Sequence, residues 1–118
     1  MTLEERNRAT KPRLDFSDEA RPLLTDFRIH ALETIYESAR KELGDLLIQA
    51  SVSVYYDHHE PVPPILVLGI VADIDGKRFG EVVDVLVDSI ATERMLWSDE
   101  EKADYRESIH CELVPLDV

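Results

Sequence analysis

Hydrophobic and polar residues alternate between Leu46 and Asp57. One set of alternate positions is apolar and contains Leu46, Ile48, Ala50, Val52, Val54 and Tyr56. The other set is mostly polar and contains Gln49, Ser51, Ser53, Tyr55 and Asp57. Successive side chains of a β-strand point to opposite faces, so this pattern predicts a strand with one buried and one wet face.

An uninterrupted apolar run, Ile65–Ala72, follows after a proline-rich connection. Several of its residues are β-branched, and it is apolar on both faces, which is typical of an interior strand. The two runs together predict a β-hairpin between Asp45 and Asp75.

Two segments have the 3-and-4 spacing of amphipathic helices. The first starts at Pro22, or after a cap at Ser17 or Asp18, and Gly44 ends it. Its apolar stripe contains Leu24, Phe27, Ala31, Leu32, Ile35, Ala39 and Leu43. The second helix starts at Asp75-Gly76, and its stripe contains Phe79, Val82, Val83, Leu86, Ile90, the stem of Arg94, and Trp97.

Two short elements complete the chain. Ser98 and Glu101 have the spacing of a capping box, which predicts a short helix that ends near Arg106. Residues 108–114 alternate again, with Ile109, Cys111 and Leu113 on the apolar side, and predict a third strand.

The predicted order is therefore α-β-β-α-(α)-β. This order favours an α+β two-layer sandwich, with a mixed sheet of about three strands and the two long helices on one face. Residues 1–16 lack periodicity and are predicted to be a mobile or loosely packed N-terminal arm. Residues 17–118 are predicted to form a single α+β domain.

Composition narrows the class of protein. The 118 residues carry a net charge of −12, and residues 1–22 are electrically balanced, so the acidity belongs to the rest of the chain. An acidic body argues against nucleic-acid binding and is compatible with a basic protein partner. No apolar run is long enough to cross a membrane, no secretory signal is recognised, and Cys111 is the single cysteine. We therefore expect a cytoplasmic protein that binds no membrane.

Asp73 and Asp75 are candidate ligands for a divalent metal. Carboxylates two residues apart on a strand share a face and can hold Mg²⁺ or Mn²⁺, with Asp45 and Asp117 at the same end of the sheet. In the other interpretation, Asp75 caps the second helix and Asp73 faces solvent. The segment 72–76 is similar over four positions to the start of haloacid dehalogenase-like phosphatases, but Lys77 breaks the motif and the remaining chain is too short for that fold.

Histidines provide a second candidate for metal binding. His58 and His59 lie in the hairpin connection, where neighbouring side chains diverge, so a site there needs Glu60 or His110 as well. The antiparallel hairpin puts this connection far from Asp73 and Asp75, so the two groups cannot form one site. A solvated loop is the alternative interpretation.

These observations favour a non-catalytic protein-binding module, of the same broad class as immunity proteins, antitoxins or accessory subunits. Its interface is predicted on the side of the sheet away from the helices, at Ile65, Val67 and Val71 with Tyr55 at the rim. Self-association as a homodimer through this strip is expected, and no cofactor is predicted. The alternative is a small divalent-metal-dependent enzyme that uses Asp73 and Asp75.

Overall fold

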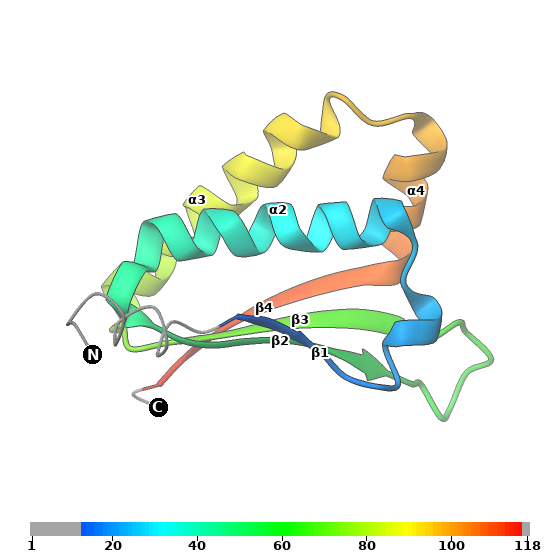
Figure 1. Ribbon diagram of the computed structural model, residues 1–118, viewed down its shortest axis with the longest axis horizontal. Helices are drawn as coiled ribbons and strands as arrows, with labels where there is room; N and C mark the ends of the chain where they lie inside the picture. Colours follow the sequence, from blue (N-terminus) through cyan, green and yellow to red (C-terminus); the bar gives the residue numbers. More distant parts are fainter. Residues whose placement is uncertain (1–12, 117–118) are drawn as a thin grey trace, which may run out of the picture.

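The computed structural model describes residues 13–116, and it consists of a β-sheet with helices packed on one face (Figure 1). The strands are β1 (Leu14–Phe16), β2 (Leu47–Tyr55), β3 (Ile65–Ala72) and β4 (Ile109–Pro115). The helices are α2 (Asp26–Leu43), α3 (Gly76–Arg94) and α4 (Asp99–Ser108), with short 3-10 turns η1 (Arg21–Leu23) and η2 (Gly44–Leu46).

The strand order in the sheet is β1-β2-β3-β4. β2 and β3 form the predicted antiparallel hairpin, whereas β1 pairs with β2 and β4 pairs with β3 in parallel. α2 and α3 lie side by side on the same face (Figure 1). The predicted α+β two-layer class is confirmed, with a mixed sheet of four strands rather than three.

The additional strand comes from the end of the predicted N-terminal arm. Residues 14–16 pair with Ala50–Val52 of β2, and the backbone N–H of Ser17 donates to the carbonyl of Val52 at 2.9 Å. Leu14 and Phe16 pack against the core. Three residues are too few to produce a recognisable alternation, so the pairing is visible only in the assembled sheet. Residues 1–12 of the predicted arm lie outside the described residues.

The alternation predicted for β2 is wrong at its start. Leu47 pairs with Ala72 and Gln49 pairs with Val71, so Ile48 is the extra residue of a β-bulge. The bulge turns Leu47 into the core at 4% exposure and leaves Leu46 and Ile48 at 39% and 45%. Tyr56, also predicted to face inward, lies beyond the strand and is 47% exposed.

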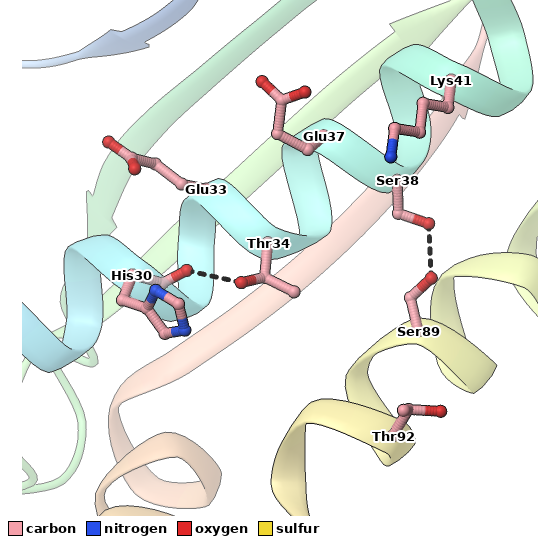
Figure 2. Close-up of a pocket in the computed structure, with 8 residues that line it drawn as sticks. All are labelled: His30, Glu33, Thr34, Glu37, Ser38, Lys41, Ser89 and Thr92. Carbon is pink, nitrogen blue, oxygen red and sulfur yellow. Dashed lines mark hydrogen bonds between the residues drawn. The ribbon is translucent and has the colours of Figure 1, made fainter. Parts of the chain in front are cut away.

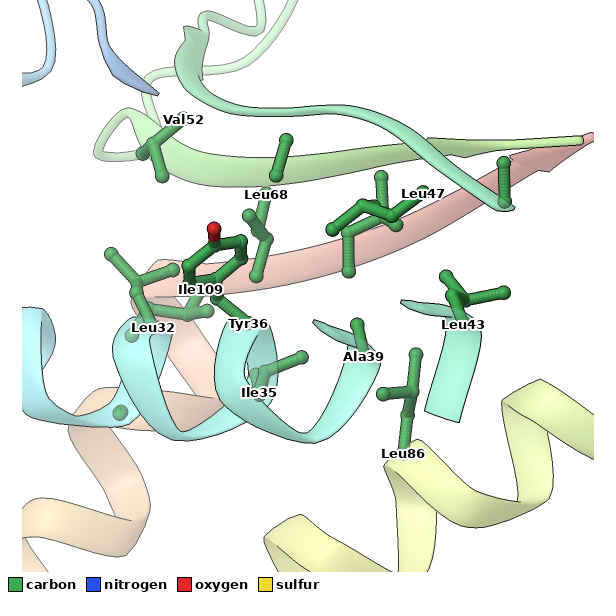
Figure 3. Close-up of a cluster of buried hydrophobic side chains, with 14 of the residues drawn as sticks. Leu32, Ile35, Tyr36, Ala39, Leu43, Leu47, Val52, Leu68, Leu86 and Ile109 are labelled. Carbon is green, nitrogen blue, oxygen red and sulfur yellow. The ribbon is translucent and has the colours of Figure 1, made fainter. Parts of the chain in front are cut away.

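The core lies between the helices and the sheet (Figure 3). Leu32, Ile35 and Ala39 of α2 belong to the same buried cluster as Leu68 of β3, and Leu86 joins this cluster from α3. β3 is buried at alternate positions, with Leu66, Leu68, Ile70 and Ala72 all nearly inaccessible to solvent. This arrangement confirms the predicted apolar stripe of α2 and assigns one face of β3 to the core.

Local signals set the ends of the helices, with two differences from the predictions. α2 begins later than Pro22, because Pro22 lies in η1 and Thr25 is the cap, whose hydroxyl accepts from the N–H of Arg28 at 3.1 Å. Gly44 ends α2 with φ of 55°, the backbone region that favours glycine. α3 ends at Arg94, so Trp97 belongs to a turn, from which it packs against Phe27 and Tyr105.

An ion pair connects α2 to α4. The guanidinium of Arg28 donates through Nε and Nη2 to the two carboxylate oxygens of Asp104, at 3.0 and 2.7 Å. Ser108 contributes a further hydroxyl contact to both side chains. Two parallel hydrogen bonds fix both distance and orientation, so this pair holds the short helix against the long one.

Candidate functional site: the open face of the sheet

The open face is the side of the sheet opposite the helices, and within residues 13–116 no helix covers it (Figure 1). Alternation assigns to it every second residue of each strand. These residues are Asp15 of β1, Gln49, Ser51, Ser53 and Tyr55 of β2, Ile65, Val67, Gly69 and Val71 of β3, and His110, Glu112 and Val114 of β4.

The register arranges these side chains in rows across the strands. Val67 lies between Ser53 and His110, and Val71 lies between Gln49 and Val114. Ile65 lies beside Tyr55, which is 57% exposed. The predicted interface residues Ile65, Val67, Val71 and Tyr55 thus share one face. They form an apolar strip along β3 with polar neighbours on β2.

Gly69 lies at the middle of this strip. A Cβ atom added there meets only the carbonyl oxygen of Ser51, at 3.9 Å, and the backbone has no positive φ. Glycine inside a strand destabilises it by about 0.5–1 kcal/mol relative to alanine. Neither the local conformation nor internal packing requires glycine at this position, so its effect is to leave bare backbone at the centre of the open face.

Charged groups surround the strip. In the central row, Asp15, Ser51, Gly69 and Glu112 follow one another across the four strands. The His110 imidazole lies 3.6 Å from the Glu112 carboxylate, and both side chains are more than half exposed. The open face therefore combines an apolar centre with an acidic and polar rim, as protein interfaces do.

Asp73 and Asp75 lie at the other end of β3 from the hairpin connection. The Asp75 carboxylate accepts from the N–H of Arg78 at 2.8 Å and is the N-cap of α3, and Asp73 is exposed. The N–H of Asp73 donates to the carbonyl of Leu46 at 2.8 Å, so its backbone lies near Asp45. Residues 13–116 contain no group of three or more acidic, histidine or cysteine side chains placed to hold a metal ion. Asp117 lies outside the described residues.

His58 and His59 lie in the exposed connection between β2 and β3. The N–H of His59 donates to the Asp57 carboxylate at 2.9 Å, which is a local turn contact. Glu60 is exposed in the same loop. His110 of β4 pairs with Val67 of β3, and Val67 follows Pro64, the last residue of the loop, by three positions. Among residues 13–116, these side chains do not form a cluster that could hold a metal ion.

A polar groove between α2 and α3 was not predicted from the sequence (Figure 2). Its volume is about 570 Å³ and it is lined by His30, Glu33, Thr34, Glu37, Ser38, Lys41, Ser89 and Thr92. The Ser38 and Ser89 hydroxyls bond to each other at 2.6 Å, and His30 Nε2 lies 2.5 Å from Glu93. In the sequence, His30, Thr34 and Ser38 are spaced four residues apart, and this spacing indicates a polar face on the helix. Ser38 bonds to another serine rather than to His30, so the two side chains do not form a serine–histidine pair.

The fold defines a small α+β two-layer protein in which, within residues 13–116, no helix covers the second face of the sheet. No family model, curated protein or solved structure matches this chain. Among the described residues, no helix has the length and apolar character needed to span a membrane.

Proposed function

We propose that this chain is a non-catalytic protein-binding module that works through the open face of its sheet. The observation that carries the proposal is the apolar strip along β3, with Gly69 at its centre. Half-buried valine and isoleucine side chains on a wet sheet face are stabilised when a second surface removes them from water.

The first partner we propose is a second copy of the chain. One patch that meets its own copy around a two-fold axis closes without leaving a free end, which makes a homodimer the simplest assembly. β2 presents polar residues opposite the valines of β3, with Ser53 opposite Val67 and Gln49 opposite Val71. The partner therefore contacts the β3 side of the sheet more closely than the β2 side.

The variant Val67→Glu tests this proposal. A carboxylate at the centre of the contact is buried without a partner, so the dimer weakens strongly. Leu96→Glu is the matched control, because Leu96 is 80% exposed in the turn after α3 and lies outside the open face. In sedimentation velocity, we expect the wild type and Leu96→Glu to run as dimers and Val67→Glu to run as a monomer.

A single species shared by all three proteins would contradict self-association through the open face. Circular dichroism of each variant checks that the fold is retained. A wild type that is monomeric at all concentrations also removes the homodimer, and the acidic charge then directs the search to basic proteins that bind the same face.

A further inference from the structure

β4 forms one edge of the sheet. Within the described residues it pairs only with β3, so the backbone groups on its outer side have no strand partner along Ile109–Pro115. The opposite edge is β1, which has only three residues. A long open edge is a template for a further strand, and natural proteins usually cover or interrupt it.

An apolar cleft lies on the helix side of this edge. Its volume is about 130 Å³, and it is lined by Ile35, Val83, Leu86, Val87, Ile90, Tyr105, Cys111 and Leu113. Burial raises the pKa of the Cys111 thiol to about 11, so this side chain lines the cleft as a neutral group. The cleft is close in size to an engineered apolar cavity of about 150 Å³ that holds one benzene molecule.

α3 is less buried than α2. Only Val82 and Leu86 of its 19 residues are buried, whereas α2 buries six of its 18. Val83, Val87 and Ile90 form an apolar flank that faces Cys111 and Leu113 across the cleft. A strand added about 4.8 Å beyond β4 would direct alternate side chains into this space under α3.

The charge on β4 identifies the kind of segment that fits. Glu112 is the central residue of β4, so antiparallel pairing of β4 with β4 of a second copy would bring two like charges opposite each other, which destabilises such a pair. The occupant is therefore an extended segment of a different protein.

The charges along the edge define its chemistry. Glu112 is exposed on the open face of β4, and Asp84 is exposed on α3 next to Val83. A side chain of the added strand that lies beside Glu112 is stabilised if it is cationic, because opposite charges across strands attract. The chain's net charge of −12 also favours a cationic segment.

We propose that the β4 edge and the cleft beneath α3 bind an extended segment of a partner protein by strand addition. Aliphatic residues of the segment fill the cleft, and lysine or arginine residues at the alternate positions face Glu112. Backbone hydrogen bonds between the segment and β4 provide the affinity, and the alternation of aliphatic and cationic side chains provides the selectivity. This site shares Glu112 with the open face, but it does not depend on the function proposed for that face.

The probe is a capped peptide with the sequence Lys-Val-Lys-Val-Lys-Val-Lys. We expect it to bind the full chain and to slow amide hydrogen exchange along β4. Two control peptides separate the contribution of strand pairing from that of charge. Proline in place of each valine prevents strand pairing and keeps the charge. Glutamate in place of each lysine reverses the charge. Both should bind at least tenfold more weakly.

Variants of the protein locate the site. Val87→Glu puts a carboxylate at the mouth of the cleft, and Glu112→Lys reverses the charge beside the edge; each should weaken binding at least tenfold. Val67→Glu, on the open face, should leave the affinity unchanged, which separates this proposal from the one above. Circular dichroism confirms that each variant is folded.

Several results would overturn the proposal. Equal binding of the proline peptide would mean a nonspecific attraction to an acidic surface, and unchanged exchange along β4 would mean binding elsewhere. Slow exchange at the outer amides of β4 without peptide would show that the chain or a second copy already covers the edge. A sedimentation change caused by Val87→Glu would likewise identify a second copy as the occupant.

Discussion

At the residue scale, the neighbouring positions Leu86 and Val87 have opposite environments on one helix. Leu86 is 7% exposed and belongs to the core, whereas Val87 is 56% exposed at the mouth of the cleft. The helical repeat places them about 100° apart around α3. The pair therefore offers a direct comparison of a packed side chain with an exposed one.

We expect Leu86→Ala to destabilise the fold by about 2–5 kcal/mol, because it removes buried methyl groups and leaves a cavity. Val87→Ala should change the free energy of unfolding by less than about 0.5 kcal/mol. Urea denaturation of both variants measures the difference. Equal effects of the two substitutions would mean that α3 is rotated relative to the arrangement described above.

Asp104 provides a residue-scale prediction about pH. The hydrogen bonds from Arg28, with a smaller Coulombic attraction, hold the pKa of the Asp104 carboxyl below its ordinary value of 3.8. A group with a lowered folded-state pKa stabilises the protein above the unfolded pKa, and this stabilisation is lost as the pH falls through the folded value. Asp104→Asn should therefore be less stable than the wild type at pH 7, and the difference should shrink towards pH 3.

Chemical denaturation at the two pH values tests this expectation. Glu107→Gln, at an exposed position on the same helix, is the control and should differ little from the wild type at either pH. A difference for Asp104→Asn that stays constant between pH 7 and pH 3 would contradict an ionised Arg28–Asp104 pair.

At the element scale, side-chain caps define where α3 and α4 begin. Asp75 caps α3, and Ser98 forms both hydrogen bonds of a capping box with Glu101, at 2.9 and 3.1 Å. These contacts satisfy backbone N–H groups that have no partner within the first turn. They also set the direction in which each helix leaves the preceding segment.

Asp75→Ala should destabilise the protein by about 1 kcal/mol through loss of the cap, and Asp73→Ala, at an exposed position two residues earlier, should have little effect. Thermal or urea denaturation measures both. Calorimetric titration with Mg²⁺ and Mn²⁺ separates capping from metal binding. Heat in the wild type that disappears in both variants would favour the metal-dependent alternative instead.

At the scale of the whole molecule, residues 13–116 leave two surfaces of the sheet without a covering element, and we propose that both bind partners. The open face lies opposite the helices, and the β4 edge lies under the flank of α3. The two surfaces share β4, but alternation assigns Glu112 to the face and Cys111 to the cleft. A partner at the edge and a partner on the face can therefore bind together, provided that the side chain of Glu112 serves only one of them.

The predicted interface and the apolar cleft depend on different kinds of structural information. The placement of Ile65, Val67 and Val71 on one face followed from strand alternation, which is a local property. The cleft followed from the position of α3 relative to β4, and no local pattern contains that information. Val83 and Ile90 were predicted to belong to the buried face of α3, whereas both are half-buried at the edge of the sheet.

The sequence by itself determined the α+β class, the hairpin, the apolar faces of α2 and α3, and the caps at Asp75 and Ser98. These features depend on residues within a few positions of one another, where periodicity and capping chemistry act directly. Only the tertiary structure decided that residues 14–16 pair with β2 and that Ile48 forms a bulge. Each of these depends on backbone pairing or packing with a distant segment, so neighbouring residues alone do not specify it.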